Sequence, residues 1–485
     1  MSAKGSVGAI DLGASTGRVI VGHVGADTLL LEEVHRFANE PVELPQGLRW
    51  DALGQYREIL AGLRAATRRG YDLQSIGVDT WGVDGGLLDG DGSLLGPPVA
   101  YRDPGHERGV EAVHARIPPD ALYRRNGLQF LPFNSLYQLA AARASASFAS
   151  AKRFLLMPDL FAYWLTGTMA AERTNASTTG LLDPRTRQWA VDLIDDLGFS
   201  RELFPPLRDP GQQLGPIRAE VAAATGQPEG TAVTSVGSHD TASAVVAVPA
   251  SDDRFAYISS GTWSLVGLEL EEPILSEASR AANFTNEGGV DGRVRFLRNV
   301  MGLWLLQETL RAWDRAGTPE ELEGLLAAAE GLPAGGPRID PDDGSFLSPG
   351  DMPARIEEAC QRSDQPVPAT RPALVRCILD SLADAYARAI ADARRLSGKD
   401  VTTVHVVGGG SLNAPLCQLT ADACGLPVVA GPVEATAIGN VLIQARAQGF
   451  IEGSLETLRA SVRATNDLRT FMPVAGPTRA VPVVG

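Results

Sequence analysis

The chain has 485 residues, of which 44% are hydrophobic and 21% are charged, a composition typical of a globular protein with two domains. Its formal net charge of −15 argues against a binding surface for nucleic acid or for an anionic membrane. No stretch approaches about 18 consecutive apolar residues, and the first residues lack a signal-peptide pattern, so we expect a cytoplasmic protein.

The first predicted elements form a strand hairpin around a turn of small residues. Residues 7–10 and 19–21 are apolar and favour strands, whereas 11–17 is rich in Gly, Ser and Thr and favours a turn. A helix is predicted from about Asp51, a residue type that commonly caps helices. A further strand is predicted at 76–78. This order of elements is typical of an α/β domain.

The same plan returns in the second half of the chain. A strand at 255–258, a Ser/Gly/Thr turn at 259–262 and a strand at 263–267 repeat the opening hairpin. The later predicted elements, in chain order, are a helix over 301–313, a looser region over 333–370, a long amphipathic helix around 374–389, a strand over 401–407, a strand at 428–429 and a last helix from about Ala435. This repetition predicts a duplicated α/β domain, with one copy over 1–250 and the other over 251–485.

Residues 11–18, with the sequence DLGASTGR, are a candidate phosphate-binding turn. Small residues let backbone N–H groups approach a polyphosphate closely, and the hydroxyl groups add donors. Asp11 could hold Mg²⁺ through water, because Mg²⁺ favours one or two carboxylates together with phosphate oxygens. Arg18 would supply a cation. An ordinary hairpin turn with a surface arginine explains the same residues equally well.

Two further segments offer places for a nucleotide. The turn at 259–262 presents amides and hydroxyls but has Ser259 where the first hairpin has Asp11. Gly408, Gly409 and Gly410 lie between a predicted strand and helix, where a flat ring could rest on bare backbone. The G-x-G-x-x-G spacing of a Rossmann loop is not met, because residue 413 is Asn.

Asp240 follows a predicted strand at 232–236 and precedes an apolar helical run. An aspartate in this position is usually a helix N-cap. It can also accept the proton of a bound hydroxyl; the helix dipole would then keep its pKa low, leaving an ionised, weakly basic carboxylate suited to phosphoryl transfer. Trp81 and Trp263 could offer flat faces to a deoxysugar, although packing in the core explains each of them equally well.

Eight short motifs, in this order, resemble the FGGY family of carbohydrate kinases, which belongs to the superfamily of actin, hexokinase and the Hsp70 nucleotide-binding domain. The resemblance runs from about residue 7 to 449. The motifs are GVDTWGVD at 77–84, YRD at 101–103, MPDLF at 157–161, NAS at 175–177, HDTASAV at 239–245, SGTWSL at 260–265, RNVMGLW at 298–304 and AGPVEA at 430–435. Within the family they are most similar to kinases that act on L-rhamnulose.

The resemblance implies two duplicated actin/hexokinase-like, ribonuclease H-like α/β domains with an interdomain cleft. The first would bind the sugar and the second the nucleotide. The implied activity is Mg²⁺- and ATP-dependent phosphorylation of L-rhamnulose at its 1-hydroxyl in rhamnose catabolism, with Asp240 as proton acceptor. The residues implied to bind ATP are Ala14, Ser15, Thr16, Gly17, Arg18, Thr262, Gln307 and Gly409. Those implied to line the sugar are Gly82, His239, Asp240, Thr241 and Asn299.

One departure from the family pattern leaves the identity of the sugar substrate open. The family members most similar to this chain carry an aromatic residue after the Val-Asp of the first motif, whereas this chain has Gly85 and Gly86. A kinase for another ketose or polyol, such as fuculose or xylulose, is therefore an alternative. Others are an actin- or Hsp70-like ATPase that moves a partner protein and a regulatory sugar-binding protein without turnover. We expect small-molecule partners only, and a monomer or a small homo-oligomer.

Overall fold

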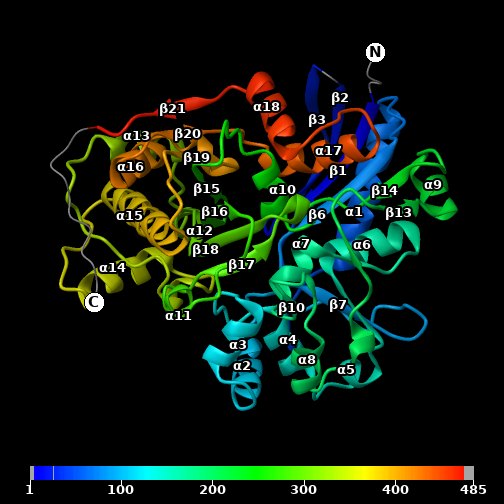
Figure 1. The fold of residues 1–485 in the computed structure, drawn as a ribbon. Coiled ribbons are helices and arrows are strands. Elements are labelled where there is room, and N and C mark those ends of the chain that lie inside the picture. Colours follow the sequence, from blue (N-terminus) through cyan, green and yellow to red (C-terminus); the bar gives the residue numbers. More distant parts are fainter. Residues whose placement is uncertain (1–4, 26, 475–485) are drawn as a thin grey trace. The chain divides into compact units, whose positions relative to one another are not determined.

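The computed structural model describes residues 5–25 and 27–474 (Figure 1). The chain divides into two compact units. The first comprises the chain up to Ala247 together with Glu269–Phe296 and Ala435–Thr465, and the second comprises Val248–Leu268, Leu297–Glu434 and the chain from Asn466. The division into 1–250 and 251–485 stays a prediction, and its two ends, 1–4 and 475–485, lie outside the described residues.

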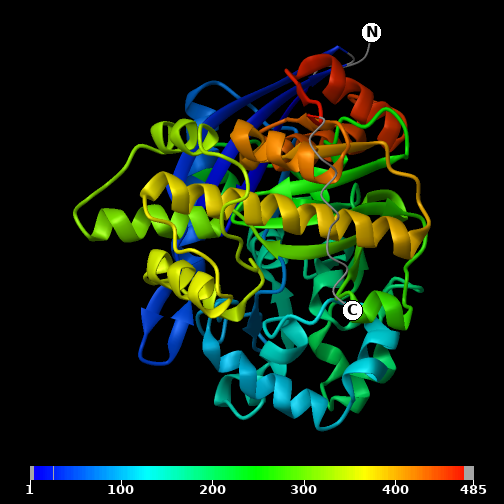
Figure 2. The ribbon, with the colours of Figure 1, turned by 90° about the vertical axis from the view of Figure 1, so that its left-hand side faces the viewer.

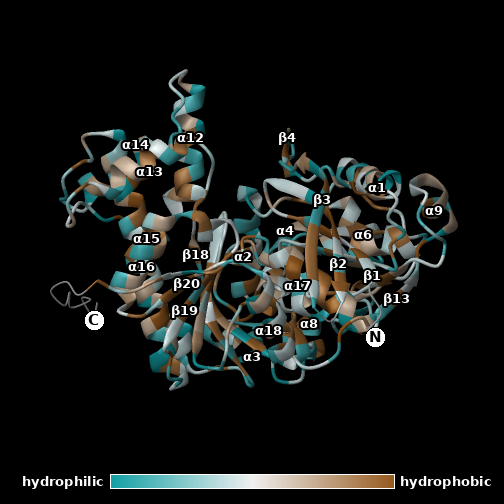
Figure 3. Ribbon diagram, turned by 90° about the horizontal axis from the view of Figure 1, so that it is seen from above, coloured by the Kyte–Doolittle hydropathy of each residue, from teal (hydrophilic) through white to brown (hydrophobic). Residues whose placement is uncertain are grey.

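The first unit is built on a six-stranded sheet with the order β13-β14-β6-β1-β2-β3. Its strands are β1 (Gly5–Leu12), β2 (Thr16–Gly25), β3 (Thr28–Ala38), β6 (Ser75–Thr80), β13 (Gln213–Pro216) and β14 (Ala232–Thr234). β1 runs antiparallel to β2 and parallel to β6, as the predicted hairpin and following strand require. The last six residues of β1 are buried, and hydrophobic stretches follow the strands in Figure 3.

Helices cover this sheet. The predicted helix after Asp51 is α1 (Ala52–Arg68), and the Asp51 side chain accepts a hydrogen bond from the Gly54 N–H at 2.9 Å. Two further helices, α10 (Asp240–Val246) and α17 (Ala435–Ala447), pack on each other, and α17 also packs on β1, β2 and β6. α17 comes from the far end of the sequence, and α18 (Leu455–Thr465) follows it in the same unit.

A second layer of the first unit lies between β6 and β13 in the sequence. Its core is a cluster of buried apolar side chains that includes Leu136, Phe154 and Leu193. The helices of this segment are α2 (Glu107–His114), α3 (Pro119–Asn126), α4 (Ser135–Ala142), α5 (Ala146–Ser150), α6 (Met157–Thr166), α7 (Arg173–Ala176) and α8 (Val191–Asp196), and α9 (Ala219–Thr225) follows β13. Its short strands are β7 (Gly85–Leu88), β8 (Arg153–Leu156), β9 (Ala171–Glu172), β10 (Leu182–Asp183), β11 (Gln188–Trp189) and β12 (Leu207–Arg208). Two more short strands, β4 (Val42–Leu44) and β5 (Gly47–Arg49), pair with each other before β6.

The second sheet repeats the strand plan of the first. Its order is β17-β18-β16-β15-β19-β20-β21. The strands are β15 (Phe255–Ser260), β16 (Trp263–Leu270), β17 (Thr285–Gly288), β18 (Val294–Met301), β19 (Thr403–Val407), β20 (Val428–Ala430) and β21 (Arg469–Phe471). β15 is antiparallel to β16 and parallel to β19, β20 is parallel to β19, and β21 is antiparallel to β20. The directions match those of β1, β2, β6, β14 and β13, which confirms the predicted duplication of an α/β fold.

The helices of the second unit differ from prediction in two places. They are α12 (Trp304–Arg315), α13 (Leu322–Glu330), α14 (Met352–Arg362), α15 (Arg371–Ser397) and α16 (Ala414–Cys424), of which α15 is the long yellow to orange helix in Figure 2. Met301 ends β18 instead of beginning a helix. The region predicted to be loose contains α14, which Asp351 caps and whose second residue is Pro353. Both residues are typical of a helix start.

In the described ranges, no helix is both long and apolar enough to cross a membrane.

Candidate active site

The predicted phosphate-binding turn lies between β1 and β2. The Gly13 N–H donates to the Thr16 carbonyl at 2.9 Å. Asn39 holds the turn from β3's end, where its N–H donates to the Ser15 carbonyl at 3.0 Å and its Nδ2 to the Gly13 carbonyl at 2.7 Å. The turn is half-buried, and the carbonyl groups of Gly13, Ser15 and Thr16 accept these hydrogen bonds. The bonds fix the shape of the backbone around Ala14 before any ligand binds.

Two residues of this turn have structural partners that the sequence did not reveal. A Cβ atom at Gly17 would lie 2.2 Å from the ring of Phe37, so this glycine is required by packing against β3. Arg18 forms an ion pair with Asp11, with Nη2 and Oδ2 2.5 Å apart. Its positive charge is therefore partly balanced inside the protein.

Asp11 and Asp79 end neighbouring parallel strands as register partners. Asp79 is fully buried, and its Oδ2 accepts a hydrogen bond from Asn440 Nδ2 of α17 at 2.5 Å. Burial raises the pKa of Asp79 well above its usual range, and the negative charge of Asp11 raises it further. Among the residues described, nothing donates to the other oxygen of Asp79, Oδ1.

Asp240 is the first residue of α10, and His239 occupies the N-cap position. The expectation of a plain N-cap aspartate is therefore wrong. Thr241 donates to Asp240 Oδ1 through its N–H at 2.5 Å and through its hydroxyl at 3.2 Å. The side chain of Asp240 is 31% exposed, so one face of the carboxylate remains open.

The pKa of Asp240 is raised, contrary to the low value expected from the helix dipole. Burial is the main cause, and the negative charge of Asp11 adds to it, while His239 and the bonds from Thr241 act in the opposite direction. The carboxylate is thus a stronger base than an ordinary aspartate. Its position at a helix start does not offset its removal from water.

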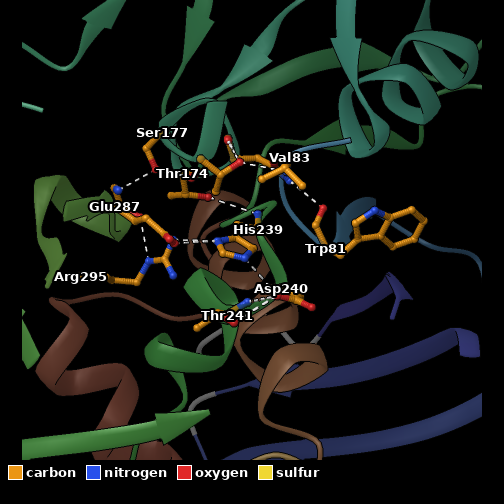
Figure 4. A network of polar contacts seen from close by, with 12 residues as sticks. Trp81, Val83, Thr174, Ser177, His239, Asp240, Thr241, Glu287 and Arg295 are labelled. Atoms are coloured by element: carbon orange, nitrogen blue, oxygen red, sulfur yellow. Dashed lines mark hydrogen bonds and ion pairs between the residues drawn. The ribbon is translucent and has the colours of Figure 1, made fainter. Parts of the chain in front are cut away.

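A buried network surrounds His239 (Figure 4). Arg295 Nη2 lies 2.9 Å from His239 Nδ1 and 3.0 Å from Glu287 Oε2, and Glu287 Oε2 lies 3.2 Å from Nδ1. The Arg295 side chain has no exposed surface. Burial would raise the pKa of Glu287, but the charges of Arg295 and His239 outweigh it and lower the pKa.

The ring of His239 faces an acidic side chain on each side. Its Nδ1 lies beside both Arg295 Nη2 and Glu287 Oε2, and its Nε2 is 3.5 Å from Asp240 Oδ1. The imidazole therefore links the Asp240 carboxylate to the buried pair of Glu287 and Arg295.

The segment after β6 forms a tight turn next to this network. The Asp84 N–H donates to the Gly82 carbonyl at 2.9 Å, and Val83 at the centre has a φ of 69°. This conformation is strained for a β-branched residue, and such strain persists only where neighbours enforce it. Thr178 does so here, because its hydroxyl accepts a hydrogen bond from the Val83 N–H at 3.0 Å.

Trp81 belongs to the core. Its side chain is buried, stacks against Trp50 with ring centroids 4.2 Å apart, and donates to Asp84 Oδ2 at 2.9 Å. The packing interpretation of this residue therefore holds. Trp263, at the start of β16, is half-buried. This exposure is compatible both with packing in the core and with a face offered to a sugar.

The glycine that departs from the family pattern lies against an aromatic ring. A Cβ atom at Gly85 would lie 2.6 Å from Cζ of Phe154 and 2.5 Å from the carbonyl oxygen of Leu155. β7 and β8 are paired here, with Gly85 opposite Leu156. An aromatic ring is therefore supplied by β8 at a position where a side chain from β7 has no space.

The other residues predicted to contact ATP belong to the second unit, where Thr262 follows β15, Gln307 lies in α12 and Gly409 follows β19. A Cβ atom at Gly410 would lie 2.0 Å from the Ser260 hydroxyl, whereas Gly409 is exposed and would have open space around its Cβ. Thr262 Oγ1 donates to Gln307 Oε1 at 3.4 Å. The structure thus brings Thr262 and Gln307 together beside the hairpin turn.

Each unit gathers its own part of the predicted site. In the first, Asp11 forms an ion pair with Arg18 and acts electrostatically on Asp240. The loops before Gly82 and before His239 are joined by a hydrogen bond from the Thr80 N–H to the Ser238 carbonyl, and Thr241 lies on α10 just after His239. In the second, Asn299 lies on β18, apart in sequence from the hairpin and the glycines. Sequence reasoning missed Asn39, Asp79, Glu172, Glu287 and Arg295 as individual residues. Asp79 lies within the motif at 77–84, whereas the other four lie outside every quoted motif.

The first unit also offers donors for Mg²⁺. Groups of three or more acidic, His or Cys side chains suited to a metal are absent from the described part of the chain. Mg²⁺ nevertheless needs only one or two carboxylates when phosphate oxygens and water complete its shell. Asp11 and the unpartnered oxygen of buried Asp79 fit that requirement.

Comparison with known proteins identifies the fold and the relatives. Residues 6–247 match the model of the N-terminal domain of the FGGY family of carbohydrate kinases, and residues 256–448 match that of its C-terminal domain. A protein named rhamnulokinase from Bacteroides thetaiotaomicron is 43% identical over 96% of this chain and 95% of its own length. A second rhamnulokinase, from Pectobacterium carotovorum, is 43% identical over 96% of this chain and 93% of its own length.

Solved structures share the fold at lower identity. A gluconate kinase from Lactobacillus acidophilus superposes with a TM-score of 0.79 at 16% identity, covering 97% of this chain and 94% of the other. A xylulose kinase from the same organism gives a TM-score of 0.77 at 16% identity over 97% and 94% of the two chains. At this identity the likeness establishes the two-domain α/β fold.

Proposed function

The chain belongs to the FGGY family of carbohydrate kinases, and we propose that it transfers the γ-phosphoryl group of ATP to the 1-hydroxyl of L-rhamnulose. The observation that carries the chemistry is the carboxylate of Asp240, which is mostly buried but open on one face and whose pKa is raised by burial at the start of α10. The sugar is proposed from the two relatives named rhamnulokinase, each 43% identical over nearly the whole chain.

In this proposal Asp240 orients the sugar hydroxyl and accepts its proton as the oxygen attacks the γ-phosphorus. The bond from that phosphorus to the bridging oxygen breaks, and ADP leaves. A loose phosphoryl-transfer transition state needs an aligned hydroxyl more than a strong base. His239, Gly82, Thr241 and Asn299 complete the sugar contacts.

The phosphate turn and the second unit bind the nucleotide. Residues Ala14, Ser15, Thr16, Gly17 and Arg18 are proposed to contact the phosphates, and Thr262, Gln307 and Gly409 other parts of ATP. Asp11 holds Mg²⁺, in part through water, with Asp79 beside it. When bound, Mg²⁺ neutralises charge on the phosphate oxygens. We also propose a cytoplasmic location, where ATP is available, and a monomeric or small homo-oligomeric state.

The test is ADP release by the purified protein with ATP and Mg²⁺. L-rhamnulose should accelerate ADP release more than any other sugar. The sugar product should carry its phosphate on carbon 1. Faster release with L-fuculose or D-xylulose would favour the alternative of another ketose, which Gly85 keeps open. Equal release with and without any sugar would overturn the kinase proposal in favour of a nucleotide-driven ATPase.

A further inference from the structure

We propose that Glu172 is a positioning residue, which holds the loop that carries Asp240 in its productive place. The proposal rests on the proposed function, in which Asp240 receives the proton. Glu172 is the last residue of β9, is buried, and precedes α7. It lies 68 residues before Asp240 in the sequence, so the link between them exists only in the folded chain.

The carboxylate of Glu172 accepts five hydrogen bonds from two segments. Ser238 donates through its N–H at 3.0 Å and its hydroxyl at 2.8 Å, both to Oε2. Thr174 donates through its N–H at 2.8 Å and its hydroxyl at 2.5 Å, and the Asn175 N–H lies at 3.2 Å. Glu172 therefore joins the start of α7 to the residue two before Asp240.

The turn that Glu172 caps reaches three loops of the candidate site (Figure 4). The Thr174 hydroxyl accepts from the His239 N–H at 3.3 Å. The hydroxyl of Thr178 accepts from the Val83 N–H at 3.0 Å, and that of Ser177 accepts from the Gly288 N–H at 2.7 Å, next to Glu287. The strained turn, the His239 loop and the strand of Glu287 thus share one support.

A carboxylate accepts all five of these hydrogen bonds, four of them at Oε2. An amide has one acceptor oxygen, so its NH₂ group would face either the Thr174 N–H at the place of Oε1 or the four donors at the place of Oε2. Either orientation sets a donor against a donor and shifts the side chain that holds Ser238. Glu172→Gln should therefore displace the segment 238–240 while leaving the shape of the core nearly unchanged.

Asp159 supplies a matched control. It is buried in the same region, and its Oδ1 accepts from the Glu172 N–H at 3.0 Å, whereas the N–H and hydroxyl of Ser238 both donate to Glu172. Burial raises the pKa of Asp159 well above its usual range, and asparagine would keep an oxygen that accepts the hydrogen bond from the Glu172 N–H. Asp159→Asn should keep kcat and the KM for ATP close to wild type.

The experiment compares wild type, Glu172→Gln, Asp159→Asn, Ser238→Ala and the double variant Glu172→Gln/Ser238→Ala. We expect kcat with L-rhamnulose to fall by about 10- to 100-fold in Glu172→Gln, since small misplacement of a reacting group has that effect. The KM for ATP should stay within about twofold. As a single variant, Ser238→Ala should lower kcat. In the double variant it should add little to the loss caused by Glu172→Gln, because the effects of residues in contact are not additive. Equal kcat in Glu172→Gln and Asp159→Asn overturns the proposal.

Crystal structures of wild type and Glu172→Gln without sugar separate this proposal from the proposed function. The loop 238–240 should move in the variant even if L-rhamnulose is not the substrate, and an unmoved loop overturns the positioning role. If Glu172→Gln does not fold, Ser238→Ala decides the question. A folded Ser238→Ala variant with wild-type kcat and an unmoved Asp240 would contradict the proposal.

Discussion

Asp11 lies beside Asp79 at the ends of the parallel strands β1 and β6, as its register partner. Neighbouring carboxyl groups disfavour each other's ionised form. Burial is the main reason why the pKa of Asp79 is raised well above its usual range, and the charge of Asp11 is the next. The negative charge of Asp11 also raises the pKa of Asp240. Asp11 thus disfavours the ionised form of two neighbouring carboxyl groups.

Replacing Asp240 with asparagine should lower sugar phosphorylation by roughly 10²- to 10⁴-fold, the usual contribution of a positioned base. The amide keeps the shape of the side chain but accepts no proton. Steady-state ADP release measures the loss, and calorimetric titration with ATP checks that nucleotide binding persists. Asp51→Asn, the same change at the cap of α1, should be neutral because asparagine caps helices equally well. Near-normal turnover in Asp240→Asn would remove this residue from the mechanism.

The raised pKa of Asp240 predicts where activity is lost in acid. The base must be ionised to accept a proton, so kcat/KM should fall as pH decreases through a pKa above the ordinary aspartate range of about 4. A pH–rate profile with L-rhamnulose measures the acid limb. An acid limb at or below pH 4, in protein that remains folded, would contradict the environment described for this carboxylate.

Gly409→Leu should weaken ATP binding without destabilising the protein. A Cβ atom at this exposed position has open space around it, so only a bound ligand would meet the new side chain. We expect the KM for ATP to rise by about tenfold or more, while the thermal midpoint stays unchanged. Gly230→Leu, at another open position, serves as the control. An unchanged KM would exclude Gly409 from the nucleotide site.

Gly85→Ala should lower the free energy of unfolding. The added Cβ would lie 2.5 Å from the Leu155 carbonyl oxygen, and backbone atoms yield little, so a cost of about 1–3 kcal/mol is expected. Gly324→Ala in α13 meets nothing within 4 Å and should stabilise slightly. Urea denaturation of both variants measures the difference. If Gly85→Ala is as stable as wild type, the packing of Phe154 against β7 is looser than described.

Asp84 should make stability depend on pH. Trp50, Trp81, Tyr101 and Gln138 donate to its carboxylate, yet burial raises its pKa to about 6. Because the pKa is higher in the folded state, the proton on Asp84 contributes fully to the free energy of unfolding below about pH 4. This contribution, up to about 3 kcal/mol, is lost as the pH rises through 6. Asp84→Asn should remove this part of the pH dependence, measured by urea denaturation from pH 4.5 to 7. An identical slope in both proteins would show that Asp84 does not titrate there.

The strand plan could be predicted because it depends on local patterns. Apolar runs interrupted by Gly, Ser and Thr marked β1, β2, β15 and β16, and Asp51 marked the start of α1. α14 was missed because Pro353 and the acidic residues near it suggested a loop. Its buried residues Met352, Ile356 and Cys360 recur every four positions, a helical spacing that outweighs composition.

The environment of the site could not be predicted, because it depends on residues far apart in the sequence. The pKa of Asp240 is set by burial and by Asp11, more than two hundred residues earlier. His239 meets Glu287 and Arg295 from later strands. The packing of Gly17 against the ring of Phe37 on β3 was missed for the same reason. A single motif shows residue types but not their partners.

The late arrival of α17 has a consequence for synthesis. Gln444 donates to the Gly8 carbonyl at 3.0 Å, and a Cβ atom at Gly439 would lie 1.8 Å from the Ser243 carbonyl oxygen, so this helix fits closely against segments made hundreds of residues earlier. The opening strands must leave the ribosome with this apolar face uncovered. A nascent chain that stalls before Ala435 would therefore be prone to aggregate, and chaperones that shield it would be needed until translation passes that point.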